Sequence, residues 1–332
     1  MKRKLRVGVI GVGSFGKNHV RVYSDLENVD LVAVCDRNQE ALQRVRKYGA
    51  REYTSYREML KREQLDLVSL VVPTKLHHAI GLDVLNSGVN LLVEKPIAAT
   101  VEEARELIEC AKRNNVKLTV GHIERFNPAI LELKKRLDRG ELGRIFRVQV
   151  SRVGPFPTRI RDVGVVIDLA VHDLDIARFL INSEVEHVYA KTEKMIHTAH
   201  EDLMVAILTF KNRTICNLNI DWLTPTKIRK LYITGEKGMF VADYLKEELI
   251  FHENDFLNNH FNYSDIMRGV SVGKTVHYNI RKREPLLAEL EHFVECVLHD
   301  KQPLVTGEDG LKALELAHAI IDSSNLNKVV RK

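Results

Sequence analysis

The sequence is short of the features that place a protein in a membrane, in an oxidising compartment or on nucleic acid. Its four cysteines, Cys35, Cys110, Cys216 and Cys296, lie far apart and form no Cys-x-x-Cys pair. This argues against a disulfide framework and favours buried thiols in a reducing cytoplasm. No uncharged apolar run approaches the roughly 18 residues that span a bilayer. Lysine and arginine together number 50 against 45 acidic residues, an excess too small to indicate a nucleic-acid partner.

Signals for metal binding and for targeting are also missing. The pairs His77-His78 and His197-x-x-His200 have no partners at metal-ligand spacing, so no metal site is expected. The basic residues 2–6 lead straight into an apolar run and are interpreted as a solvated lead-in, not as a targeting signal. A chain of 332 residues, 45% hydrophobic and 29% charged, is therefore expected to be a globular cytoplasmic protein of one or two domains.

A glycine-rich turn near the start of the chain carries the clearest functional signal. The apolar residues 5–10 are followed by Gly11-x-Gly13-x-x-Gly16 and then by a segment that can be helical. In a dinucleotide site the first glycine permits a tight turn, the second lets the pyrophosphate approach the backbone, and the third lets helix and strand pack closely. The helix N-terminus, with the intervening Ser14 and Phe15, then faces the phosphates. Three glycines also occur in ordinary loops, so the motif needs a second feature.

That second feature is an acidic residue after the next predicted strand. Residues 31–35 are apolar and are followed by Asp36, whose carboxylate is placed to bind the adenosine ribose hydroxyls. A 2′-phosphate would meet this negative charge, so we expect NAD as the cofactor in preference to NADP. Arg37 beside it offsets part of the repulsion, so the preference is not absolute.

Strand and helix signals alternate over the first third of the chain, which predicts a doubly wound parallel sheet. Strands are expected at 5–10, 31–35, 65–72, 90–93 and 117–121. Beyond residue 121 strands follow one another at 145–153, 185–191, 203–210, 214–221, 230–234 and 239–242, with helices at 127–138, 165–181, 286–298 and 311–325. We expect an α/β protein with a dinucleotide-binding domain at 1–121 and an α+β domain on a largely antiparallel sheet at 122–332. One face of the second sheet must be covered by helices or by another subunit.

Two groups of residues are candidates for catalysis. Glu94-Lys95-Pro96 directly follows the strand at 90–93, and ligands of doubly wound sheets bind beyond the carboxyl ends of the strands. Lys95, with Glu94 beside it, is therefore expected in the cofactor crevice, although a lysine at such a place is commonly a surface residue. Asp168 and His172 share a face of an otherwise apolar helix. They form either a structural ion pair or a proton-transfer pair in which Asp168 orients His172.

Taken in order, the glycine motif, Asp36, Glu94-Lys95-Pro96 and Asp168-x-x-x-His172 resemble the Gfo/Idh/MocA family of oxidoreductases over essentially the whole chain. The resemblance implies an N-terminal Rossmann domain and a C-terminal domain with an open, mostly antiparallel sheet whose face makes a homodimer or homotetramer contact. It implies that Lys95, Asp168 and His172 are catalytic and that the Lys95–Pro96 peptide is often cis. It also implies that Pro73, Thr74 and His77 line the nicotinamide side, with Glu94 among the cofactor-binding residues.

Two further segments resemble the nucleotide-sugar branch of this family. They are residues 121–128, which include Arg125, and residues 154–164, which include Arg159 and Arg161. The resemblance implies NAD-dependent oxidation of a sugar secondary alcohol, with UDP-N-acetylglucosamine at C3 as the expected substrate, bound by Arg125 together with the catalytic pair. Arg159 and Arg161 either hold the substrate diphosphate or are simply solvated. A free polyol such as myo-inositol as substrate and a non-catalytic NAD(H)-binding regulator are the alternatives.

Overall fold

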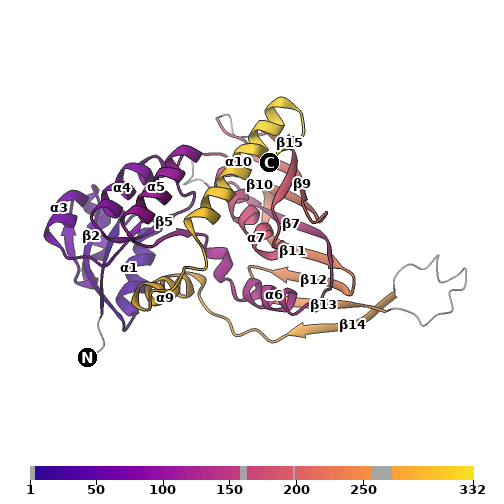
Figure 1. Ribbon diagram of the computed structural model, residues 1–332, viewed down its shortest axis with the longest axis horizontal. Helices are drawn as coiled ribbons and strands as arrows, with labels where there is room; N and C mark the ends of the chain where they lie inside the picture. Colours follow the sequence, from indigo (N-terminus) through magenta and orange to yellow (C-terminus); the bar gives the residue numbers. More distant parts are fainter. Residues whose placement is uncertain (1–3, 158–162, 197–198, 256–270) are drawn as a thin grey trace, which may run out of the picture. The chain divides into compact units, whose positions relative to one another are not determined.

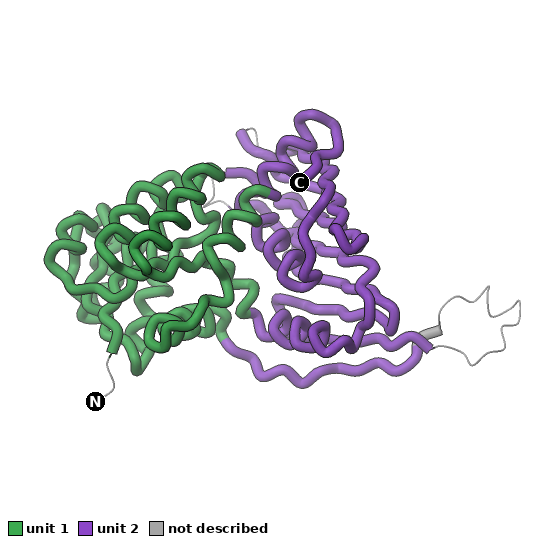
Figure 2. The backbone as a smooth tube through the Cα atoms, viewed as in Figure 1, with its two compact units in different colours: residues 1–126, 284–315 green, residues 127–283, 316–332 purple. Residues whose placement is uncertain are grey.

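The chain forms two compact units in the computed structural model, which describes residues 4–157, 163–196, 199–255 and 271–332 (Figure 1, Figure 2). Unit 1 contains residues 1–126 and 284–315, and unit 2 contains residues 127–283 and 316–332. The boundary expected at residue 121 is close to the first crossing of the chain from one unit to the other. The return of residues 284–315 to unit 1 was not anticipated, because a helix signal at 286–298 does not reveal which sheet the helix packs on.

Unit 1 is built on a six-stranded parallel sheet in the order β3-β2-β1-β4-β5-β6. Its strands are β1 (Leu5–Ile10), β2 (Val29–Cys35), β3 (Arg51–Tyr53), β4 (Leu67–Leu70), β5 (Asn90–Glu94) and β6 (Leu118–Gly121). β1 and β4 are almost fully buried, as strands covered on both faces are. The strand order reverses between β1 and β4, the switch point at which such sheets bind ligands. The predicted Rossmann sheet is confirmed.

The helices of unit 1 are α1 (Gly16–Asp25), α2 (Gln39–Val45), α3 (Tyr56–Arg62), α4 (His77–Asn86), α5 (Val101–Arg113) and α9 (Pro285–Leu298), with 3₁₀ turns η1 (Arg46–Tyr48), η2 (Thr74–Leu76) and η3 (Ile123–Phe126). Thr100 and Glu103 form the reciprocal capping box of α5 that their spacing predicts. The short elements β3 and α3 were not predicted, because three strand residues show no period and α3 buries only Met59. No helix in the described part of the chain is long and apolar enough to cross a membrane.

Unit 2 is built on a nine-stranded sheet in the order β14-β13-β12-β11-β7-β10-β9-β8-β15. β7 and β10 run parallel, whereas the other neighbouring strands of the described sheet are antiparallel. The strands are β7 (Ile145–Pro155), β8 (Val185–Glu193), β9 (Leu203–Phe210), β10 (Ile215–Asp221), β11 (Leu223–Gly235), β12 (Gly238–Asp243), β13 (Glu248–Asp255), β14 (Ser271–Tyr278) and β15 (Val330–Arg331). β13 and the two edge strands, β14 and β15, were not predicted, because their polar residues blur the alternation.

One face of this sheet carries the core of unit 2, and no helix of the described residues packs on the other face, called the open face below. α6 (Pro128–Asp138), α7 (Val171–Ile181) and the second half of α10 (Gly307–Leu326) pack on the first face (Figure 1). Along β9, buried and exposed residues alternate, so Val205 and Ile207 point to the opposite face. There they lie with Tyr189 and Ile215, and the four side chains are 40–49% exposed. These four side chains form a strip of exposed apolar surface.

A buried ion pair joins β7 to α7. The side chains of Arg152 and Asp173 are 2% and 0% exposed, and the guanidinium donates from Nε to Oδ2 at 2.5 Å and from Nη2 to Oδ1 at 3.1 Å. The guanidinium also lies 5.2 Å from the ring centroid of Tyr244. Because a two-point contact fixes orientation as well as distance, this pair constrains the rotation of α7 next to His172.

We expect Asp173→Ala to lower the free energy of unfolding by about 3–5 kcal/mol, because it leaves the guanidinium of Arg152 buried without its carboxylate. The double variant Arg152→Met/Asp173→Leu should lose less, since neither charge of this pair is then left buried without the other. Urea unfolding followed by circular dichroism measures both effects, with the exposed Glu248→Ala as the control. A double variant that is less stable than Asp173→Ala would contradict this prediction.

Candidate active site

The turn between β1 and α1 has the backbone that a dinucleotide site needs. Gly11 has a φ of +86°, and a Cβ there would lie 2.2 Å from the carbonyl oxygen of Val71. A Cβ on Gly16 would lie 1.9 Å from the carbonyl oxygen of Gly11, so α1 starts in direct contact with the turn. At Gly13, no described atom lies within 4 Å of the position a Cβ would take. The backbone there faces open space, as the close approach of a pyrophosphate requires.

The N-terminus of α1 faces the same turn. The helix begins without a side-chain cap and has no acidic residue in its first turn, so its first N–H groups and its dipole favour an anion. Ser14 is exposed and Phe15 is half-buried, with its ring edge-on to that of His19 at a centroid distance of 5.3 Å. The residues present therefore fit the phosphates of a dinucleotide.

Asp36 follows β2, and its carboxylate organises the glycine turn. Oδ2 accepts a hydrogen bond from the N–H of Val12 at 2.9 Å, and Oδ1 accepts one from the N–H of Asn38 at 2.9 Å. A carboxylate has sites for about four hydrogen bonds, so Asp36 can hold the turn and still accept two ribose hydroxyls. Arg37 is exposed beside it. The spacing predicted the ribose contact but gave no sign of the link to Val12.

His77 joins the loops that follow β4 and β5. It is 1% exposed, with Nδ1 2.9 Å from the carbonyl oxygen of Pro96 and Nε2 2.8 Å from that of Val72. Burial lowers the pKa of this imidazole, which favours the neutral ring donating from one nitrogen. Pro73 is exposed and Thr74 is half-buried at the start of the same loop. Contact of these three residues with a nicotinamide stays a prediction.

Lys95 follows β5 at the carboxyl edge of the sheet, and Glu94 is held beside it. Oε1 of Glu94 lies 3.2 Å from Nε2 of His19, and Oε2 accepts a hydrogen bond from the backbone N–H of Lys95 at 3.3 Å. The carboxylate lies against Gly121, where a Cβ would come within 2.7 Å of Oε1. The Lys95–Pro96 peptide is cis, as the family resemblance implies. The carboxylate of Glu94 thus fixes the backbone from which Lys95 projects.

A buried acid that the sequence did not single out lies close enough to Glu94 to interact with it. Glu289, in α9, is 2% exposed, and neither oxygen of its carboxyl group has a hydrogen-bond partner among the described residues. Burial, and after it the charge of Glu94, raises the pKa of Glu289 well above its ordinary value. The fold therefore favours the protonated acid. A single glutamate in an apolar helix pattern gives no signal of this environment.

The raised pKa of Glu289 gives stability a defined pH dependence. The folded protein holds the proton of Glu289 more tightly than the unfolded chain does. The stability that this proton contributes is therefore fully present below the pKa of the unfolded state and is lost as pH rises towards the pKa of the folded state. We expect the Tm of the wild type to fall between pH 5 and 8 by more than that of Glu289→Gln, which has no such proton. Glu102→Gln, at an exposed site, is the control, and parallel pH profiles for wild type and Glu289→Gln would refute this assignment.

Asp168 and His172 lie where a π-helical turn joins an α-helix in unit 2. The turn is η4 (Val166–Ala170), and α7 follows it from Val171. The helix predicted over 165–181 is present, but the apolar period did not reveal that its first turn is wider than an α-helical turn. The wider turn also alters the rotation about the helix axis between positions 168 and 172. The two side chains therefore share a helix face only approximately. Both side chains are half-buried, and π-turns occur often at functional sites.

Of the three arginines expected to bind substrate, the structure describes Arg125. It is 4% exposed in η3, with Nη2 3.0 Å from Oδ1 of Asp309 and Nη1 donating to the carbonyl oxygen of Leu304 at 2.9 Å. These contacts favour a structural role for Arg125 and lend no support to the predicted substrate contact. Arg159 and Arg161 lie outside the described residues. Within the described ranges, no group of three or more His, Cys, Asp or Glu side chains is placed to hold a metal ion.

The sequence matches two family models that follow one another along the chain. Residues 5–122 match an oxidoreductase family with an NAD-binding Rossmann fold, and residues 134–331 match the C-terminal alpha/beta domain of the same family. The chain therefore belongs to the Gfo/Idh/MocA family of oxidoreductases, and the resemblance seen in its motifs is confirmed.

Individual relatives include dehydrogenases of nucleotide sugars and of polyols. The chain is 29% identical to UDP-N-acetylglucosamine 3-dehydrogenase of Acidithiobacillus ferrooxidans, over 94% of this chain and 95% of that one. A solved structure of that enzyme matches with a TM-score of 0.86, over 97% of this chain and 98% of the other. It is 27% identical to scyllo-inositol 2-dehydrogenase (NAD⁺) of Bacillus subtilis over 97% and 95%. The WlbA dehydrogenase of Bordetella pertussis, solved with NADH and UDP-GlcNAcA, is 27% identical with a TM-score of 0.83 over 99% of each chain. The enzyme class is common to these relatives, whereas their substrates differ.

Proposed function

We propose that the protein oxidises the C3 hydroxyl of UDP-N-acetylglucosamine to a ketone with NAD⁺ as the acceptor. The observation that carries the proposal is the open backbone at Gly13, next to the uncapped N-terminus of α1. Lys95 follows β5 at the carboxyl edge of the same sheet. Similarity to UDP-N-acetylglucosamine 3-dehydrogenase over 94% of the chain supports the nucleotide sugar. The segments 121–128 and 154–164 point to the same substrate class.

In the proposed reaction the side chains of this protein handle the proton and the oxygen. NAD⁺, when bound, supplies the acceptor for the hydride that leaves the sugar carbon. His172 takes the proton of the hydroxyl group through a ring nitrogen, and Asp168 orients the imidazole and stabilises its protonated form. The ammonium group of Lys95 donates a hydrogen bond to the same oxygen and stabilises the negative charge that develops there.

The preference for NAD⁺ over NADP⁺ is part of the proposal and is carried by Asp36. We expect Asp36→Ala to raise the KM for NAD⁺ by about 10-fold or more, because hydrogen bonds to a charged group are lost. The KM for NADP⁺ should fall, since the repulsion of the 2′-phosphate is removed. Initial rates with each cofactor measure both effects, and Asp30→Ala, at the opposite end of β2, is the control. A fall in the KM for NAD⁺ would overturn the role of Asp36.

The substrate is tested by NADH formation, followed by absorbance, from NAD⁺ and UDP-N-acetylglucosamine. A carbonyl-trapping reagent is added because alcohol oxidation is unfavourable at equilibrium, and myo-inositol and scyllo-inositol are assayed in parallel. Turnover of the nucleotide sugar and not of the inositols is the expected result. Turnover of an inositol alone would overturn the substrate and keep the enzyme class. Binding of NAD⁺ without turnover of any of the three would favour a non-catalytic regulator.

The role of His172 is tested by His172→Asn, which keeps a polar side chain but removes the titrating ring. We expect kcat to fall by about 10²–10⁴-fold, the usual contribution of a general base, while the Kd for NAD⁺ stays unchanged. His187→Asn, in β8 of the same unit, is the matched control. A His172→Asn enzyme with full kcat would remove His172 from the mechanism.

We also propose that the open face of the unit 2 sheet, with Tyr189, Val205, Ile207 and Ile215, forms the contact of a homodimer or homotetramer. The four cysteines are buried and free, which supports the proposed location in a reducing cytoplasm.

A further inference from the structure

The turn that carries Asp168 begins without a cap from its own segment of chain. Gly164 and Val165 precede η4, and neither side chain has a hydrogen-bond acceptor. The first N–H groups of a helix have no partner within the helix. Their partners must therefore come from elsewhere in the fold.

Glu201, in the connection between β8 and β9, supplies two of these partners. Its backbone carbonyl oxygen accepts a hydrogen bond from the N–H of Val165 at 2.9 Å, and its Oε1 accepts one from the N–H of Val166 at 3.2 Å. A carboxylate at this place also stabilises the positive end of the helix dipole. The N–H of Asp168 donates to the carbonyl oxygen of Gly164 at 3.0 Å, so Asp168 lies in the same turn that Glu201 holds.

Gly164 leaves the space that the carboxylate of Glu201 occupies. A Cβ on Gly164 would lie 2.1 Å from both Cδ and Oε1 of Glu201 and 2.2 Å from Oε2. Real Cβ contacts are never this short, so a larger residue at position 164 would have to displace the carboxylate. The position of the Glu201 carboxylate therefore depends on the absence of a side chain at Gly164.

The residue after Glu201 is tied to the end of β8 and to residues 195 and 196. Asp202 is 1% exposed, and its carboxylate accepts hydrogen bonds from the N–H groups of Met195 at 2.8 Å and Ile196 at 2.7 Å. The N–H of Asp202 donates to the carbonyl oxygen of Glu193 at 3.0 Å. Glu201 is thus presented from an anchored backbone.

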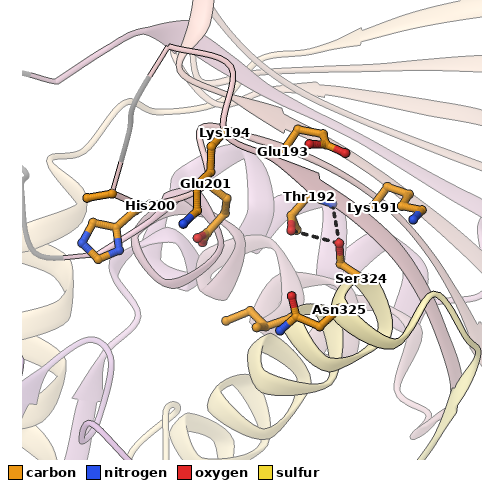
Figure 3. Close-up of a pocket in the computed structure, with 10 residues that line it drawn as sticks. Lys191, Thr192, Glu193, Lys194, His200, Glu201, Ser324 and Asn325 are labelled. Carbon is orange, nitrogen blue, oxygen red and sulfur yellow. Dashed lines mark hydrogen bonds between the residues drawn. The ribbon is translucent and has the colours of Figure 1, made fainter.

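Glu201 also lines a cavity of about 570 Å³ on the surface of unit 2 (Figure 3). Lys194, His200 and Glu201 lie at one end of this cavity, and Thr192 is hydrogen-bonded to Ser324 at the other (Figure 3). Glu193 lines the same cavity from the end of β8, and its side chain is exposed. Glu193 is therefore a suitable control residue, because it lines the same cavity but its carboxylate does not cap η4.

We propose that Glu201 is a positioning residue for the catalytic turn. By holding the start of η4 it sets the place of Asp168 and, one turn further along, of His172. The inference rests on the proposed function, which assigns the proton transfer to these two side chains.

Kinetics of four variants test the effect on catalysis. Glu201→Ala should lower kcat by about ten- to a hundredfold, because a small misplacement of catalytic groups has effects of this size, and should leave the KM for NAD⁺ unchanged. Glu201→Gln keeps an acceptor oxygen and should restore most of kcat. Gly164→Ala displaces the carboxylate and should resemble Glu201→Ala, and the two changes together should be no worse than either alone. Glu193→Ala is the matched control and should behave as wild type.

Hydrogen exchange tests the contact itself without relying on turnover. In Glu201→Ala and Gly164→Ala, the amides of residues 163–172 should exchange faster than in the wild type, in Glu201→Gln and in Glu193→Ala, as measured by mass spectrometry. Unchanged exchange in Glu201→Ala would overturn the proposal, whatever the kinetics. Faster exchange with an unchanged kcat would overturn the positioning role. A wild type inactive on all substrates would contradict the proposed function, and exchange would still decide whether Glu201 holds the turn.

Discussion

The close approach of backbone to backbone at Gly11 and Gly16 is the constraint on which the rest of unit 1 depends. Because neither contact leaves room for a Cβ, α1 begins in direct contact with the turn that follows β1, and its uncapped N-terminus lies at the carboxyl edge of the sheet. Asp36 is tied to this turn through Val12, and His77 joins the loops that follow β4 and β5. Strand order thus brings the glycine turn, the carboxylate of Asp36 and Lys95 to one edge.

In unit 2 the constraint is of a different kind, the rotation of a helix about its axis. Asp168 and His172 belong to a helical segment that packs against an apolar core. Polar side chains in such a helix require the helix to be fixed in rotation, since a small rotation would bury them. Arg152 supplies one constraint through its buried pair with Asp173, and Glu201 supplies another at the first turn. The π-turn between these two constraints is where Asp168 lies.

The local sequence pattern was sufficient to predict the fold class and to locate the motifs along the chain. Apolar runs followed by Gly11, Asp36 and Lys95 predicted the parallel sheet and its functional edge, because in a doubly wound fold the residue after each strand lies at that edge. What the sequence did not reveal depends on contacts between distant residues. Glu289, beside Glu94, and Glu201, at the start of η4, are ordinary glutamates until the fold brings them to their partners. The π-turn and the return of residues 284–315 to unit 1 were missed for the same reason: neither changes the local period.

The central claim is that the hydrogen at C3 of UDP-N-acetylglucosamine is transferred to NAD⁺, and isotope transfer tests it most directly. UDP-N-acetylglucosamine deuterated at C3 is incubated with the protein and NAD⁺, and the NADH is isolated and examined by mass spectrometry and proton NMR. The account predicts one deuterium at C4 of the nicotinamide ring and a slower initial rate than with unlabelled substrate. NADH that carries no deuterium would contradict it, because the hydride would then have come from another carbon.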